Sequence, residues 1–299
     1  MSITVRVPAK VNVQLAVGAA RPDGFHDLAN VFLAVSLYDE VTATPADGLR
    51  VTCSGPDADQ VPLDGTNLAA RAATALAARH GISPDVHLHI AKDIPVAGGM
   101  AGGSADGAAA LLACDALWGT GASRDELLAL CAELGSDVPF SLVGGAALGT
   151  GRGERLEPLE TGGTFHWVFA VADGGLSTPA VYGEFDRLTA GTDVPVPAAS
   201  PALLEALRTG DATALAGALA NDLQPAALSL RPSLAATLAA GTDAGALAGL
   251  VSGSGPTTAF LVKDEEAARA VAGALLASGT CRTARVATSP APGATQIRT

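Results

Sequence analysis

The sequence predicts an α/β protein made of two domains. Three observations lead to this prediction. The chain of 299 residues exceeds the usual size of one hydrophobic core, strand-like runs alternate with helix-like runs, and a glycine-rich turn leads into a helix. Hydrophobic residues make up 48% of the chain, which is enough for a well-buried core. We place the boundary just after the glycine-rich run 144–153, so that residues 1–156 form the first domain and residues 157–299 the second.

The first domain opens with strand-like alternation. Residues 3–7 and 11–17 each alternate apolar and polar side chains, which predicts two strands. The period of two places Lys10, Asn12 and Gln14 together on the face opposite the valines. We therefore expect this lysine and this asparagine to point the same way.

A turn follows at Arg21-Pro-Asp-Gly24, where proline, aspartate and glycine are the residues that turns favour. It presents Phe25 and His26 directly before another apolar run, residues 31–37. This arrangement predicts a hairpin.

A capped helix and a strand come next. Asn67 precedes an alanine-rich run that Gly81 closes, and both are residue types that cap helix ends. Residues 86–90 then read as a strand with His87 and His89 on one face. A two-histidine metal site lacks a third ligand at recognisable spacing, so we interpret the pair as an exposed strand face.

The most informative stretch is Pro95-Val-Ala-Gly-Gly-Met-Ala-Gly-Gly-Ser-Ala-Asp106, which reads as a glycine-rich turn opening into a helix that continues to about Trp118. Glycines permit close backbone approach and positive φ, and a helix N-terminus offers unpaired N–H groups and a positive dipole end. Both features favour a bound phosphate; the alternative is that the glycines only pack a strand against a helix. The run lacks the defining residues of a P-loop, a dinucleotide fingerprint and a nucleophile elbow, which disfavours those three chemistries.

Helix signals continue beyond this stretch. Ser123-Arg-Asp-Glu126 is a capping box, and it predicts a helix that ends at Gly135. Asp137 follows, with Pro139 two residues later. Taken locally, this pattern predicts that Asp137 caps a short helix.

The second domain reads as strands and alanine-rich helices. We expect a strand at 165–171, a loop through Ser177-Thr-Pro179, a linker-like loop at 194–201 and then two or three helices. A second glycine-rich turn around residues 253–256 leads into a buried strand that ends at Val262. A helix at 265–276 and a short final strand complete the chain.

Charge and composition exclude several classes of partner. The formal net charge is −12, whereas nucleic-acid binding relies on clustered Lys and Arg, so we expect no nucleic-acid partner. No run approaches the roughly 20 apolar residues of a membrane span, and the N-terminus lacks a secretory signal, so we expect no membrane association and a cytoplasmic location. The four cysteines lie far apart without a C-x-x-C pair, which favours free thiols. Nothing in the sequence indicates an oligomeric state.

Three separated motifs resemble those of the GHMP small-molecule kinases: Pro8-Ala-Lys10-Val-Asn12, the glycine-serine loop at 95–106 and Gly253-Ser-Gly-Pro256. The resemblance covers most of the chain. The longer runs Arg-Pro-Asp-Gly-Phe-His, Gly-Ser-Asp-Val-Pro-Phe and Ser-Gly-Ser-Gly-Pro-Thr are similar to the branch of that family whose acceptor alcohol is a cytidyl diphosphate compound of the non-mevalonate route to isoprenoid precursors. The resemblance implies ATP as donor and the 2-hydroxyl of that small molecule as acceptor. It also implies a two-domain α/β (α+β) fold, with an N-terminal domain of the ribosomal-protein-S5 domain 2 type, a ferredoxin-like C-terminal domain and the active site between them.

The resemblance also implies roles for individual residues. Lys10 and Asp137 correspond to the catalytic pair of the family, and Asn12 and His26 to substrate contacts. Phe25 and Phe185 sit where aromatic residues of the family hold cytosine, and Asn67 corresponds to a position near the adenine. The phosphate cradle of ATP corresponds to Pro95, Val96, Ala97, Gly98, Gly99, Met100, Ala101, Gly102, Gly103, Ser104 and Ala105.

These residue types suit phosphoryl transfer, which needs an aligned nucleophile and compensation for charge on the moving group. A carboxylate at Asp137 can accept the proton of the substrate hydroxyl or orient that hydroxyl, a role that would override the cap reading. Lys10 beside it would keep the carboxylate ionised and stabilise charge on the γ-phosphate. Mg²⁺ is expected because it bridges nucleotide phosphates, although the sequence does not identify its protein ligand.

The chain departs from the family pattern at four positions. Ala101 stands where glycine is commoner, Ala105 where a second serine is found, Met100 where leucine is found and Phe25 where tyrosine is usual. The loss of the hydroxyl at 105 removes a side-chain contact, while backbone N–H donors remain. The loss of the phenol at 25 leaves the stacking face intact.

Three other functions remain alternatives at this point. Another kinase of the family, such as a homoserine or mevalonate-pathway kinase, is disfavoured by Phe25, His26 and Phe185, a set that suits a planar base. A nucleotide-binding protein without catalysis is disfavoured because both Lys10 and Asp137 are present. An oxidoreductase is disfavoured by the failed dinucleotide spacing.

Overall fold

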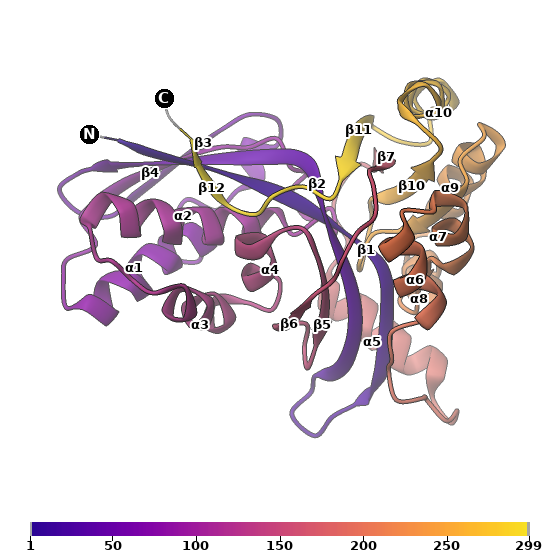
Figure 1. The fold of residues 1–299 in the computed structure, drawn as a ribbon, viewed down its shortest axis with the longest axis horizontal. Helices are drawn as coiled ribbons and strands as arrows, with labels where there is room; N and C mark the ends of the chain where they lie inside the picture. The colour runs from indigo at the N-terminus through magenta and orange to yellow at the C-terminus, as the bar shows by residue number, and fades with distance from the viewer. Residues whose placement is uncertain (1, 298–299) are drawn as a thin grey trace.

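Two long antiparallel strands run through the molecule in the computed structural model, which describes residues 2–297. Strand β1 (Ile3–Ala20) pairs with β2 (His26–Pro45) through the predicted turn, in which the Gly24 amide donates to the Arg21 carbonyl at 2.9 Å. Figure 1 shows both strands running from the helices α1–α3 toward the second half of the chain. The hairpin prediction is confirmed, but the two predicted N-terminal strands are one continuous strand.

The continuity of β1 has a local explanation. Its pairing with β2 shifts register between Pro8 and Ala9 and again between Asn12 and Gln14. Such irregularities bend a strand and re-aim side chains without ending the ladder. The segment that carries Lys10 and Asn12 lies between the two shifts.

The first sheet contains eight strands within the described residues. They are β1, β2, β3 (Arg50–Ser54), β4 (Val86–Ala91), β5 (Ala146–Thr150), β6 (Arg155–Pro158), β8 (Ala220–Asn221) and β12 (Thr295–Ile297). The order is β12-β1-β2-β4-β3, with β5 joining β2 to β6 and β8 pairing with β1. Helices α1 (Leu68–His80), α2 (Gly102–Trp118), α3 (Arg124–Leu134) and α4 (Val138–Val143) accompany it, with a short 3₁₀ turn at Ala58–Gln60.

The caps that bound these helices are those the sequence predicts. The Asn67 side chain accepts a hydrogen bond from the Ala69 amide, and Gly81 ends α1 in the left-handed conformation. Ser123 accepts from the Glu126 amide at the start of α3. The alanine-rich faces of α1 and α2 pack on each other, because alanine lets helix backbones approach closely, and α2 also packs on β1 and β2.

In the described part of the chain, the second sheet has four strands in the order β11-β7-β10-β9. They are β7 (Phe165–Val171), β9 (Ala248–Val251), β10 (Thr258–Val262) and β11 (Thr283–Ser289). Helices come between β7 and β9 and α10 (Glu265–Ser278) between β10 and β11, which is the β-α-β-β-α-β succession of a ferredoxin-like sheet. The helices between β7 and β9 are α5 (Thr178–Thr189), α6 (Pro201–Thr209), α7 (Ala212–Ala218), α8 (Gln224–Leu230) and α9 (Ser233–Asp243).

Two local expectations in this half are wrong. The segment expected as a loop through residues 177–179 begins α5, because Ser177 takes the N-cap position and Pro179 fits the first turn of a helix. Four short helices follow the 194–201 loop, where two or three were expected, because Asp211 caps an additional short helix.

The predicted boundary at residue 156 falls inside β6 and stays a prediction. Most strands of the first sheet come before this boundary in sequence, and all strands of the second sheet come after it. The exceptions are β8 and β12, which follow the boundary but pair with β1 of the first sheet. Ion pairs also connect the two parts: Arg285 on β11 bonds Asp93, and Arg282 bonds Asp57. Among the described residues, we find no helix with both the length and the apolar character needed to span a bilayer.

Candidate active site

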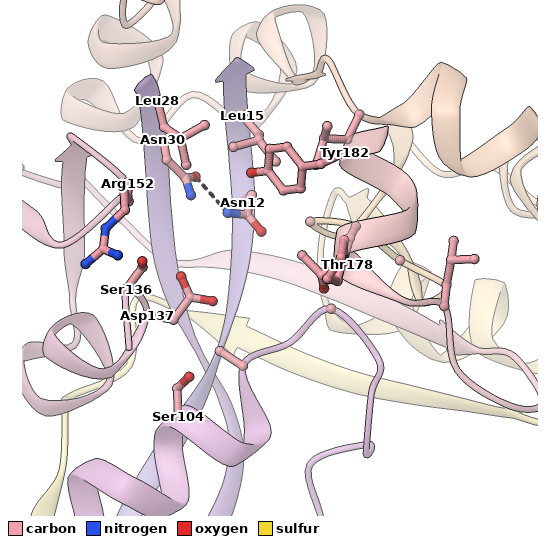
Figure 2. Close-up of a pocket in the computed structure, with 18 of the residues that line it drawn as sticks. Asn12, Leu15, Leu28, Asn30, Ser104, Ser136, Asp137, Arg152, Thr178 and Tyr182 are labelled. Carbon is pink, nitrogen blue, oxygen red and sulfur yellow. Dashed lines mark hydrogen bonds between the residues drawn. The ribbon is translucent and has the colours of Figure 1, made fainter. Parts of the chain in front are cut away.

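A cleft of about 760 Å³ opens where the two parts of the molecule meet. Its walls come from β1, β2, the glycine-rich run, the start of α4, the start of α5 and the turn between β9 and β10. Figure 2 shows side chains from several of these elements, including Asn12, Asp137 and Thr178, pointing into one space. The volume is typical of a small-molecule site.

The floor of the cleft carries a chain of hydrogen bonds. Lys10 Nζ donates to Asn12 Oδ1 at 2.5 Å, and Asn12 Nδ2 donates to Asn30 Oδ1 at 2.7 Å. All three side chains are buried, with exposed fractions of 5%, 2% and 4%. The expectation that Lys10 and Asn12 share one strand face is confirmed.

Lys10 also joins β1 to the glycine-rich run. Its Nζ donates to the Gly99 carbonyl at 2.8 Å, and the Ser252 hydroxyl donates to the same oxygen at 3.1 Å. Burial lowers the pKa of Lys10, and the nearby negative charge of Asp137 partly opposes that shift. The two members of the expected catalytic pair are therefore close enough to interact electrostatically.

The glycine-rich run folds as expected, but its glycines are used differently. Of its four glycines, Gly99 has a positive φ of 73°. A Cβ on Gly99 would lie 2.1 Å from the Ser252 carbonyl oxygen, so the backbone needs glycine there for space as well as for conformation. Positive φ also occurs at Ala97 (51°) and Ala101 (60°), which costs an L-residue about 1–2 kcal/mol. Ala101 is one of the positions at which the sequence departs from the pattern that it resembles.

A buried ion cluster holds the start of α2 in place. Lys92 Nζ contacts Asp39 at 2.5 Å and Asp106, in the second turn of α2, at 2.7 Å. Burial raises the pKa of the Asp106 carboxyl well above its ordinary value, and the Lys92 ammonium opposes that shift. A Cβ on Gly102 would lie 2.9 Å from Lys92 Nζ, so the first turn of α2 sits directly on this ammonium.

Asp137 occupies the N-cap position of α4 as predicted, yet its side chain makes no cap hydrogen bond. The half-buried carboxylate lines the cleft, and within residues 2–297 we find no hydrogen-bond donor to it. Figure 2 shows it between Ser104 and Asn12. The local cap reading therefore holds for the backbone only, and the carboxylate is available to a ligand.

Aromatic rings and an arginine line the far end of the cleft. Phe25 is 47% exposed, and the Arg152 guanidinium lies 4.8 Å from its ring centroid. His26 Nε2 is 2.8 Å from Asp186 Oδ1, and the His26 ring lies 5.0 Å from the Tyr182 ring at 35°. Flat surfaces from β2 and α5 thus face one region.

Phe185 is in a different position from the one its expected role needs. It is 6% exposed and packs one helical turn behind Tyr182, among apolar side chains of the hairpin, α5 and α8. Its ring meets His26 edge-on at 5.9 Å, and it does not line the cleft. Direct contact of Phe185 with a base stays a prediction, while the half-buried Tyr182 lines the cleft.

The structure brings most of the expected site residues to the cleft. Those that line it are Lys10, Asn12, Phe25, His26, Ala97, Gly98, Gly99, Ala101, Gly102, Gly103, Ser104 and Asp137. Those that do not are Asn67, Pro95, Val96, Met100, Ala105 and Phe185. The Asn67 amide is engaged as the α1 cap and donates to the Pro62 carbonyl, whereas its neighbour Leu68 lines the cleft.

The sequence reading missed three lining residues that carry chemistry: Asn30, Arg152 and Tyr182. Arg152 had a signal, since it is a lone cation inside a glycine-rich turn. Tyr182 had no such signal, because the face of α5 that lines the cleft is set by packing against the β1–β2 hairpin. Asn30 had no local signal beyond being a polar residue in an apolar strand.

The two histidines of β4 form hydrogen bonds with side chains of β3. The Thr52 hydroxyl lies 2.8 Å from His87 Nε2 and 2.9 Å from His89 Nδ1, and Ser54 contacts the second histidine. In the described part of the chain, no group of three or more His, Cys, Asp or Glu side chains is arranged to hold a metal ion.

Two family models match the chain. "GHMP kinases N terminal domain" matches residues 67–145, and "GHMP kinases C terminal" matches residues 203–280. The first match contains the glycine-rich run and Asp137, and it ends one residue before β5.

Relatives extend the likeness over the whole length. A 4-diphosphocytidyl-2-C-methyl-D-erythritol kinase of Streptomyces avermitilis is 83% identical over 99% of this chain and 100% of its own, and that of Streptomyces coelicolor is 79% identical over the same shares. A crystal structure of 4-(cytidine 5'-diphospho)-2C-methyl-D-erythritol kinase, 34% identical, superposes with a TM-score of 0.76 over 95% of this chain and 98% of that one. A homoserine kinase from Cytophaga hutchinsonii, 21% identical, has a TM-score of 0.71 over 99% and 97% of the two chains and shares the fold.

Proposed function

The chain belongs to the GHMP kinase family, and from that premise we propose which residues of the cleft carry out its reaction. The chain is an ATP-dependent kinase. It transfers a phosphoryl group to the 2-hydroxyl of 4-diphosphocytidyl-2-C-methyl-D-erythritol, in non-mevalonate isoprenoid precursor biosynthesis, in line with the names of relatives 83% and 79% identical to it. We further propose the cytoplasm as its location, because ATP is supplied there.

Asp137 receives or orients the acceptor hydroxyl. The observation that carries this assignment is a cleft-facing carboxylate at a helix N-cap with no cap hydrogen bond. A capping aspartate would accept from the backbone, and this one leaves its oxygens for a ligand. A carboxylate at hydrogen-bond distance from a substrate hydroxyl can take its proton as the oxygen attacks phosphorus.

Lys10 organises the site and faces the transferred group. Its contacts with Asn12 and with the Gly99 carbonyl fix its Nζ between the floor of the cleft and the phosphate loop. A cation held there compensates charge on the γ-phosphoryl group, and its fixed position avoids reorganisation during transfer.

The loop 97–104 binds the phosphates of ATP. The start of α2 directs its unpaired N–H groups toward the cleft, and a Cβ on Gly103 would make only an ordinary contact, 3.9 Å from Leu68 Cδ1. Mg²⁺ fits this end of the cleft, because Ser104 offers a hydroxyl oxygen there, and oxygen donors are what this ion prefers. When bound, the ion neutralises phosphate charge and aligns the terminal phosphoryl group.

The substrate enters with its base at the opposite end. Phe25, Tyr182 and His26 offer ring faces that suit a planar pyrimidine, and Arg152 supplies a cation for an anionic substrate. The base and the reacting hydroxyl then lie at the two ends of one cleft. This arrangement favours a cytidyl substrate over a short acceptor such as homoserine.

Asp137→Asn tests the assignment. We expect turnover to fall by about 10²- to 10⁴-fold, the usual contribution of general-base catalysis, with ATP-analogue affinity within about twofold of the parent. Turnover is measured by a coupled ADP assay and affinity by calorimetry. Activity within a few-fold of the parent would return Asp137 to a purely structural role at the start of α4.

A further inference from the structure

Asn30 is a buried side chain of the cleft that the proposed mechanism does not use. It lies on β2, is 4% exposed and lines the cleft beside Asn12. Its Oδ1 accepts from Asn12 Nδ2 at 2.7 Å, as the dashed line in Figure 2 shows. Across residues 2–297 we find no acceptor for its two Nδ2 protons. A buried amide that faces a cleft with free donors is suited to bind a ligand.

The orientation of this amide is fixed by the lysine at the other end of the hydrogen-bond chain. An ammonium can only donate, so the Asn12 atom that contacts Lys10 must be the carbonyl oxygen. The Asn12 amide nitrogen must then donate, and the Asn30 atom that meets it must be its carbonyl oxygen. The Asn30 nitrogen therefore carries two N–H donors, and a group that this nitrogen meets in the cleft must be an acceptor.

The position of Asn30 indicates which part of the substrate it meets. His26, Leu28 and Asn30 are alternate residues of β2 that line the cleft, so at about 3.3 Å per residue Asn30 lies roughly 13 Å along the strand from the base end. It is one hydrogen bond away from Asn12 and two from Lys10, at the reacting end. The polyol of the substrate, whose C1 and C3 hydroxyls flank the reacting C2 hydroxyl, belongs at this end.

We propose that Asn30 is a substrate-binding residue whose amide donates a hydrogen bond to the C1 or C3 hydroxyl oxygen of the acceptor polyol. This inference rests on the proposed function and adds a specificity contact to it. The bond holds the polyol in one rotation, so that the C2 hydroxyl and not its neighbour meets Asp137.

Asn30→Asp is the variant that tests the proposal. It keeps the size of the side chain and the acceptor for Asn12 but removes both donors. We expect the KM for the cytidyl substrate to rise about three- to tenfold, which is the usual worth of one hydrogen bond, while the KM for ATP stays within about twofold. Gln14→Glu is the matched control. Gln14 is an equally buried amide on β1, it bonds Ala198 and Ser200 outside the cleft, and its change should leave both KM values unaltered.

Analogues of the substrate lacking the C1 or the C3 hydroxyl separate a direct contact from other effects. With the analogue that lacks the contacted hydroxyl, the KM of Asn30→Asp should equal that of the parent. With the other analogue, the full rise in KM should remain. General repulsion by the new carboxylate would affect all three compounds equally and cancels in this comparison. If the Asp variant does not fold, Asn30→Ser, which is too short to reach the ligand, takes its place.

An equal rise in KM for all three compounds would overturn the proposal, because it would indicate a contact with the diphosphate or an indirect effect. An unchanged KM for all three would overturn it as well, and in both cases the kinase activity of the parent would stand. A parent enzyme that did not phosphorylate the cytidyl substrate would overturn the proposed function together with this inference.

Discussion

Tyr182 and Phe185 lie three residues apart on α5, and substitution of each by alanine should give opposite phenotypes. Tyr182 lines the cleft and its ring lies 5.0 Å from the His26 ring. Stacking of a base on one aromatic ring is worth roughly 1–3 kcal/mol, so Tyr182→Ala should raise the KM for the cytidyl substrate by about five- to 150-fold. The KM for ATP should stay close to that of the parent, because the phosphate loop is at the other end of the cleft.

Phe185→Ala should act on stability instead. The ring is 6% exposed and is enclosed by side chains such as Leu15, Val17 and Leu223. Truncation of a buried phenylalanine costs about 3–5 kcal/mol, because it loses burial and leaves a cavity. At about 2–4 °C per kcal/mol for a chain of this size, the melting temperature should fall by roughly 6–20 °C.

Four measurements separate the two residues: KM for the cytidyl substrate and melting temperature by calorimetry, for both variants. Tyr182→Phe serves as the control, since it keeps the ring and should retain most of the affinity. The reasoning would be refuted if Phe185→Ala kept the parent melting temperature and lost substrate affinity. That result would mean that Phe185, and not Tyr182, stacks on the base.

Two further predictions concern the phosphate loop and Lys10. Gly103→Ala should weaken ATP-analogue binding without lowering the melting temperature, because the nearest atom to its added Cβ is 3.9 Å away. Gly99→Ala places a Cβ 2.1 Å from a carbonyl oxygen, so it should lower both the ATP-analogue affinity and the melting temperature. Equal melting temperatures for the two variants would contradict the structure. Burial lowers the pKa of Lys10 below its ordinary value of 10.5, so between the folded-state pKa and 10.5 the unfolded chain binds more protons. The free energy of unfolding of the parent should therefore rise relative to that of Lys10→Met as pH increases through this window. Urea titrations at several pH values measure both free energies. If the two plots of unfolding free energy against pH run parallel, the ammonium is not destabilised by burial.

Local patterns predicted the elements whose boundaries are set by local chemistry. The helix capped by Asn67 and Gly81, the capping box at Ser123 and the strand 165–171 occur where the sequence indicates. Each depends on interactions within a few residues, such as a side chain bonding a nearby amide. The continuity of β1 across Pro8 was not predictable in this way, because β2 supplies the partner that keeps the strand extended.

The candidate site was predictable where a motif carries it and not where tertiary packing decides. Lys10, Asp137 and most of the glycine-rich run line the cleft. The choice between Tyr182 and Phe185 depends on which face of α5 packs against the β1–β2 hairpin, and that is a long-range fact. The inward direction of Asn30 likewise follows from its register with Leu15 and its bond to Asn12, both distant in sequence.

The Gly99 carbonyl explains why three separated motifs occur together. It accepts from Lys10 of the first motif and from Ser252 at the edge of the third, while it belongs to the second. A Cβ on Gly253 would lie 3.2 Å from both Lys10 Nζ and Asn12 Oδ1, so the third motif needs glycine in order to approach the first. The position of Lys10, the path of the phosphate loop and the closure of the second domain on the cleft are thereby linked at one oxygen atom. Because the acceptor comes from one motif and its two donors from the other two, none of them can form this centre alone.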